Sequence, residues 1–136
     1  MTTATVLTLF LAKAYGIYFL AAGLTGLLSK DRWAKVLDDL RASPALVYIC
    51  GIFTFALGVA LIHAHNIWLD PFAALISLFG WAAAAEGLIL IVYPGPLLNL
   101  PTSIVRPQAV LAYSLIVLVL GAVLLLLGLT GRAGIA

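Results

Sequence analysis

The stretch Gly80-Trp81-Ala82-Ala83-Ala84-Ala85-Glu86-Gly87 decides how the rest of the chain is interpreted. It lies inside an apolar run from Phe72 to Tyr93, and Glu86 is the only acidic residue within any long apolar run of the sequence. Small residues let neighbouring membrane helices approach closely, whereas a carboxyl group inside a membrane is costly unless it is paired, hydrated or protonated. We therefore expect this segment to be the central helix of a small membrane-embedded bundle.

The composition also indicates a membrane protein. The chain has 136 residues, of which 65% are hydrophobic and 9% are charged, and its mean hydropathy is +1.21. A soluble domain usually carries about 25% charged residues, so this surplus of apolar surface requires lipid as its solvent. A bilayer-spanning helix takes ~20 residues, so we predict one all-α domain over residues 1–136, an integral membrane four-helix bundle.

Local signals set the limits of four predicted spans. Ser43-Pro44 and Asp70-Pro71 each combine an N-cap residue with proline at the first helical position. Pro94-Gly95-Pro96 cannot continue a helix, and Gly131 suits a C-terminal cap. The first span lacks a basic segment before it, so we interpret it as retained and not as a signal peptide. The predicted spans are residues 5–28, 44–63, 71–93 and 107–129.

Residues 29–43 predict a short amphipathic helix at the membrane surface. Seven of them are charged, and the apolar side chains recur at helical spacing. Such a helix lies flat at the interface, with Trp33 at headgroup depth and Trp68 as a second interfacial anchor in the next loop. It is either a docking surface for a partner or a plain connector, and we favour the connector.

Glycines recur with one spacing in every predicted span. Each span carries two of them seven residues apart, which places both on nearly one face of the helix. This heptad repeat predicts a tight left-handed four-helix bundle. The pairs are Gly16 and Gly23, Gly51 and Gly58, Gly80 and Gly87, and Gly121 and Gly128.

Counting residues along the spans suggests polar partners for Glu86. It lies ~22 Å from the outer end of its span at 1.5 Å per residue, level with Tyr113 and Ser114 on the fourth span. Lys13 lies ~10 Å closer to the outer end. We predict that Glu86, Lys13, Tyr113 and Ser114 are buried polar groups, and that Glu86 is mostly neutral and bonded to the two hydroxyl groups. The alternative is a proton or cation relay with Lys13 as counter-charge.

His63 and His65 are weak candidates for metal ligands, with Asp70 or Asn66 as a third. In a helix these two positions point ~200° apart and cannot share an ion, whereas in an extended turn they can face the same way. Two histidines are nevertheless a weak signal compared with a four-ligand set. Haem is disfavoured because bis-histidine ligation needs two facing positions. We predict no metal and no cofactor, and expect the histidines to cap the second span and order the turn. The single Cys50 excludes an intramolecular disulfide.

The basic residues predict an orientation in the membrane. The first connector carries four of them and the third carries Arg106, whereas the opposite side has only Arg132. The positive-inside rule therefore puts these connectors in the cytoplasm and both termini in the periplasm. No basic run is interleaved with exposed aromatic residues, so we do not expect nucleic-acid binding.

Several short motifs resemble a widespread family of uncharacterised small bacterial inner-membrane proteins, with a layout similar to DoxX-like four-span proteins. In that family a basic residue often stands at the position of Glu86, which is therefore a departure. The resemblance implies an inner-membrane location and no established activity. Its motifs are Tyr15-Gly16-x-Tyr18, Gly23-Leu24, Ser43-Pro44-Ala45-Leu46, Gly51, Gly58, His65-Asn66-x-Trp68, Gly80-Trp81, Gly87 and Tyr93-Pro94.

The sequence contains no acid pair spaced for substrate chemistry and no phosphate-binding motif. We therefore expect a protein that is not an enzyme but an accessory or structural subunit of a larger membrane assembly. Its expected partners are the lipid bilayer and other membrane subunits or further copies of the chain. One alternative is a small transporter or proton-conducting protein using Glu86 and Lys13, and another is a metal- or quinone-linked redox accessory protein.

Overall fold

A computed structural model describes residues 5–132, with Thr102 described by its backbone alone. Within this range the chain is helical, with no strand, and the all-α fold class is confirmed. The four predicted spans appear as helices whose ends agree with the prediction to within one residue, and all four are long and apolar enough to cross a membrane. The elements are α1 (Val6–Leu28), α2 (Arg32–Ala42), α3 (Pro44–Ala64), α4 (Pro71–Val92), α5 (Gly95–Leu98), η1 (Thr102–Val105) and α6 (Pro107–Thr130).

The helix ends lie where the sequence places cap residues. The Ser43 hydroxyl accepts a hydrogen bond from the Leu46 backbone N–H at 3.3 Å. The Asp70 carboxylate accepts one from the backbone N–H of Phe72 at 3.4 Å. These bonds satisfy backbone donors that the first turn of a helix leaves without partners. At the far end, Gly131 is the C-cap of α6, as predicted.

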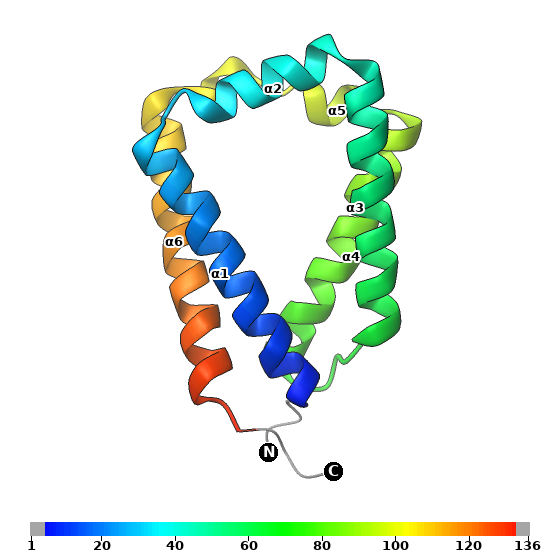
Figure 1. Ribbon diagram of the computed structural model, residues 1–136, viewed down its shortest axis with the longest axis vertical. Helices are drawn as coiled ribbons and strands as arrows, with labels where there is room; N and C mark the ends of the chain where they lie inside the picture. The colour runs from blue at the N-terminus through cyan, green and yellow to red at the C-terminus, as the bar shows by residue number, and fades with distance from the viewer. Residues whose placement is uncertain (1–4, 133–136) are drawn as a thin grey trace.

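The long helices pack as two pairs, α1 with α6 and α3 with α4 (Figure 1). The glycines lie in these two contacts. A Cβ atom on Gly16 would lie 2.9 Å from the Gly121 carbonyl oxygen, and a Cβ on Gly121 would lie equally close to that of Gly16. A Cβ on Gly51 would lie 3.1 Å from the Gly87 carbonyl oxygen. The four helices form a bundle, as predicted, but the glycines bring them together in two close pairs and not all around one tight core. Glycine spacing alone does not specify which helix packs against which.

The two pairs converge at the α3–α4 loop and diverge towards α2, which crosses from one pair to the other (Figure 1). At this wide end Arg41 of α2 donates from Nε to the Leu98 carbonyl oxygen at 2.7 Å and from a terminal nitrogen to that of Leu100 at 3.3 Å. These bonds attach α2 to the segment around α5. The predicted amphipathic helix therefore covers the wide end of the molecule.

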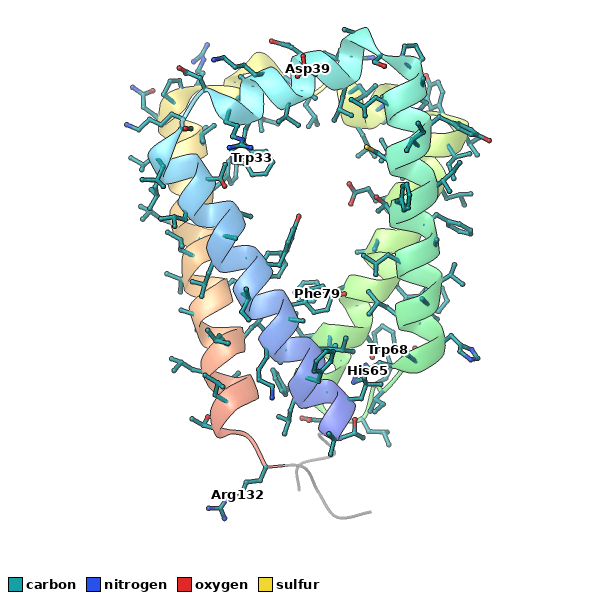
Figure 2. The ribbon with its side chains drawn as sticks, viewed as in Figure 1. Trp33, Asp39, His65, Trp68, Phe79 and Arg132 are labelled. Carbon is teal, nitrogen blue, oxygen red and sulfur yellow. The ribbon has the colours of Figure 1, made fainter. Side chains whose placement is uncertain are left out.

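Aromatic side chains hold the pairs together towards the narrow end. The ring of Phe79 on α4 lies 4.8 Å from that of Tyr15 and 5.4 Å from that of Phe19, both on α1. These centroid distances are typical of favourable aromatic contacts. Figure 2 shows Phe79 directed from α4 towards α1. This contact closes one end of the space between the pairs.

Candidate functional site

A buried histidine joins the two helix pairs at their narrow end. His65 follows α3 directly, and only 3% of its surface is exposed. Its Nε2 atom lies 2.8 Å from the Thr8 hydroxyl of α1, and its Nδ1 atom lies 2.9 Å from the Ser77 hydroxyl of α4. Thr8 and Ser77 are themselves buried. One imidazole therefore links α1 to α4, and its backbone N–H caps α3 on the Leu61 carbonyl at 2.7 Å.

The neighbouring hydrogen bonds assign the proton of the His65 ring. The Ser77 hydroxyl donates to the Ile67 carbonyl oxygen at 3.1 Å and accepts from the Ile67 backbone N–H at 2.9 Å. Its one proton is thus used, so Nδ1–H of His65 must donate to it. Nε2 then accepts from the Thr8 hydroxyl, which itself accepts from Thr5. The network is complete with a neutral imidazole.

Burial favours the same protonation state. Desolvation lowers the pKa of His65 below its ordinary value of 6.5, against a smaller opposite contribution from a backbone hydrogen bond. The charged form would lose its hydration and would offer Nε2 as a donor where the neutral ring accepts. His65 therefore functions in the structure as a neutral cross-link between the helix pairs.

A second polar contact lies beside it in the α3–α4 loop. The Asn66 side-chain oxygen accepts hydrogen bonds from the indole nitrogens of Trp68 at 2.6 Å and Trp81 at 3.2 Å. Both rings are about half exposed. His65 and Trp68 lie together at this end in Figure 2. The loop is therefore fixed on α4, while the depth of Trp68 in a membrane stays a prediction.

The two histidines do not converge on a common ligand position. His63 is exposed on α3, whereas both ring nitrogens of His65 are engaged by hydroxyl groups. Within residues 5–132, no three metal-ligating side chains lie close enough together to hold an ion. His65 thus has the capping and ordering role expected of the histidines, but through a buried contact with α1 that was not expected.

The space between the pairs contains a partly open cavity of about 550 Å³, which we call the lower chamber. Its walls come from α1 on one side and from α3 and α4 on the other. The lining is apolar and aromatic, with four residues that carry polar side-chain atoms. It consists of Leu11, Ala14, Tyr15, Tyr18, Phe19, Thr54, Leu57, Leu61, Phe79, Ala82, Ala83 and Glu86.

Glu86 is the only acidic residue in this lining, which contains no lysine or arginine. Its side chain is exposed to the chamber, and among the described residues no ion pair involves it. Tyr15 lines the same chamber, but its hydroxyl oxygen is buried and has no hydrogen-bond partner among the described residues. Glu86 thus presents a carboxyl group without an ion-pair partner to a largely apolar space.

A second cavity of about 320 Å³, the upper chamber, lies under α2. Tyr18 and Phe19 line both chambers. Trp33 points from α2 into the space between the helix pairs (Figure 2) and lines the upper chamber. Trp33 thus faces the interior of the molecule, and its depth in a membrane stays a prediction.

The four predicted buried polar residues are not brought together. Tyr113 is 53% exposed and lines the upper chamber with Ser114, which is buried against Gly26. Lys13 is half-buried where α1 packs on Gly128 of α6. Glu86 faces the lower chamber. The expectation of a buried group with Glu86 bonded to Tyr113 and Ser114 is therefore wrong, because α4 packs on α3 and α6 packs on α1.

Sequence analysis did not identify Thr8, Ser77 or Tyr15 as site residues. Ser77 is the only hydroxyl residue in the apolar part of α4, a signal that was present but was not used. Thr8 and Tyr15 carry no comparable signal. Comparison with protein-family models, curated proteins and solved structures finds no match to this chain. The resemblance to the bacterial inner-membrane family stays a prediction.

Proposed function

We propose that this multi-pass membrane protein is not an enzyme and that it binds a small lipophilic molecule, taken from the bilayer, in the lower chamber. One observation carries the proposal. A carboxyl group, Glu86, faces an apolar cavity between two helix pairs and is without an ion-pair partner in the described chain. Ionisable groups inside membranes usually mark functional sites.

The size and surroundings of the chamber support a small ligand. Its volume of about 550 Å³ lies within the usual range for ligand sites, roughly 300–1,000 Å³. The helix α2 crosses the wide end (Figure 1), and the His65 junction closes the narrow end (Figure 2). A transmembrane helix lying along the space would collide with both. A molecule dissolved in the bilayer needs only sideways access through the partly open wall.

The lining supports binding over conduction. A proton or ion path needs polar groups in continuous succession across the membrane. Glu86 is the one charged lining residue of the lower chamber, and the upper chamber is lined mainly by apolar side chains. Lys13, the proposed counter-charge of a relay, lies in the contact with α6. We therefore place transport by Glu86 and Lys13 below ligand binding, and redox accessory function below both.

We propose a bacterial inner-membrane location with α2 on the cytoplasmic side. The basic residues of the first connector and Arg106 lie at the wide end, and Arg132 follows α6 at the opposite end. The positive-inside rule then puts the His65 end, and both ends of the described chain, in the periplasm.

An accessory subunit of a larger assembly is the second candidate. The same unpaired Glu86 favours it, because a basic side chain from a partner could occupy the chamber from the side. The two candidates differ in what stays bound to the protein after purification. A ligand-binding protein retains a small molecule after purification to a single chain, whereas an assembly subunit retains another polypeptide or a further copy of itself.

The proposed function is tested by photolabelling in lipid nanodiscs with an alkyl diazirine probe. We expect labelling of chamber residues such as Leu57 and Ala82 to saturate and to fall when a non-reactive alkyl compound is added in excess. Phe53, which is 73% exposed and outside both chamber linings, should label in proportion to probe without competition. Equal, non-saturable labelling of both surfaces would reject the binding site.

A further inference from the structure

Resting on the proposed function, we propose that the lower chamber takes a lipophilic primary amine. Its ammonium group is bound by Glu86, and its hydrocarbon body lies against the aromatic wall formed by Tyr18, Phe19 and Phe79. The inference depends on the side chains that line the chamber, which include a carboxyl group without an ion-pair partner among the described residues and several aromatic rings.

The carboxyl group selects for a hydrogen-bond donor. An ionised carboxylate accepts hydrogen bonds and donates none, whereas an ammonium group carries three donors and no acceptor. Charge-assisted bonds between the two are stronger than bonds between neutral groups. A primary amine therefore supplies the charged donor that Glu86 lacks among the described residues.

The aromatic wall favours the same ligand. The rings of Tyr18 and Phe19 are tilted against each other with centroids 5.5 Å apart, and Phe19 meets Phe79 edge to face at 5.4 Å. Cations bind to the faces of aromatic rings, and more strongly where water is excluded. The same rings cover hydrocarbon further from the charge. The lining therefore accommodates both parts of an amphiphilic amine.

The lining disfavours anionic lipids and fatty acids. It contains no lysine or arginine, and Lys13, the basic residue of α1, lies in the α6 contact. A carboxylate or phosphate ligand would face Glu86 with no compensating charge, which is destabilising in an environment of low polarity. Neutral alcohols fit the volume but leave the carboxylate without a charged partner.

The position of Glu86 suits a ligand that arrives from the bilayer. It lies six residues before the end of α4 at Val92, which is about 9 Å from the wide end of the molecule. An alkylamine inserted with its head towards this end can reach that depth while its chain stays in hydrocarbon.

The test is isothermal titration of the full chain in nanodiscs with dodecylamine and, separately, with dodecanol, with empty nanodiscs subtracted. The two probes have the same chain and differ in the charged head. We expect the wild type to bind the amine at least about tenfold more tightly than the alcohol, as charge-assisted bonds imply. Glu86→Gln should remove this preference while keeping binding of the alcohol.

The controls separate failure of this inference from failure of the proposed function. Ala82→Trp places a large ring in the chamber, whereas Ala85→Trp adds the same ring at an exposed position outside the chamber lining. If amine and alcohol bind the wild type equally and Ala82→Trp abolishes both, the amine inference is wrong and the binding chamber stands. If neither probe binds above the empty nanodiscs, both are wrong. The wild-type comparison decides the inference even if Glu86→Gln fails to fold.

Discussion

Thr8 and His65 are 57 residues apart in the chain, yet the Thr8 hydroxyl lies 2.8 Å from His65 Nε2. This bond connects the α1–α6 pair to the α3–α4 pair. Ser77 completes it on the other side of the ring at 2.9 Å. The end of the molecule opposite α2 is therefore held by one fully engaged imidazole and the aromatic contact beside it.

The two histidines are expected to differ sharply when replaced. His65→Gln cannot reproduce both ring bonds, so it should lower the free energy of unfolding by about 1–3 kcal/mol. His63→Gln changes an exposed side chain and should stay within about 0.5 kcal/mol of the wild type. Thermal unfolding in one detergent measures both. Equal stability of the two variants would show that the buried bonds contribute nothing.

His65 should also make stability depend on pH. Its pKa in the folded chain is lowered by burial from 6.5, so between the two values the unfolded chain binds more protons. The contribution of His65 to stability is complete above pH 6.5 and declines as the pH falls below it, towards the folded-state pKa. The wild type should therefore lose more thermal stability in this window than His65→Gln. An identical decline in both proteins would contradict a neutral His65.

Gly87 should be intolerant of a methyl group, because a Cβ there would overlap the backbone of Phe55 on α3. We expect Gly87→Ala to destabilise the α3–α4 pair by about 1–3 kcal/mol, the usual cost of overpacking. Gly95→Ala is the matched control, since its nearest neighbour would be the Tyr93 ring at 3.6 Å. Thermal unfolding of both variants checks the contrast, and a tolerated Gly87→Ala would mean that α3 and α4 pack less closely.

The orientation can be checked with single cysteines in a Cys50→Ala background. Lys35 lies on the exposed face of α2, and Leu69 is 90% exposed in the α3–α4 loop. A cysteine at Lys35 should react with an impermeant thiol reagent only after the cytoplasmic side is opened, and one at Leu69 should react in intact cells. If both cysteines reacted from the same side, α2 and the α3–α4 loop would not lie on opposite sides of the membrane, and the proposed orientation would be rejected.

The helix limits could be predicted from the sequence because their causes are local. Ser43, Asp70 and Gly131 act within one turn of the helix ends that they cap. The pairing of the helices could not be predicted in the same way. All four spans are uniformly apolar and all carry glycines at one spacing, so neither pattern distinguishes one neighbour from another.

For the candidate site, too, local features could be predicted from the sequence, whereas contacts between residues far apart in the chain could not. Counting residues gives the depth of Glu86 and Tyr113 but not the direction in which each faces, and the two side chains line different chambers. For His65, the capping of α3 is local and was expected, whereas Thr8 is brought to it only by the packing of α1 on α4. Long-range partners of this kind follow from the assembled fold.

The binding chamber itself is tested most directly by native mass spectrometry of the protein extracted from its own membrane. The account predicts that the wild type retains a small lipophilic molecule, that Ala82→Trp loses it, and that the matched Ala85→Trp keeps it. The same bound masses in all three proteins, or none in the wild type, would contradict the claim that the space between the two helix pairs is a ligand site.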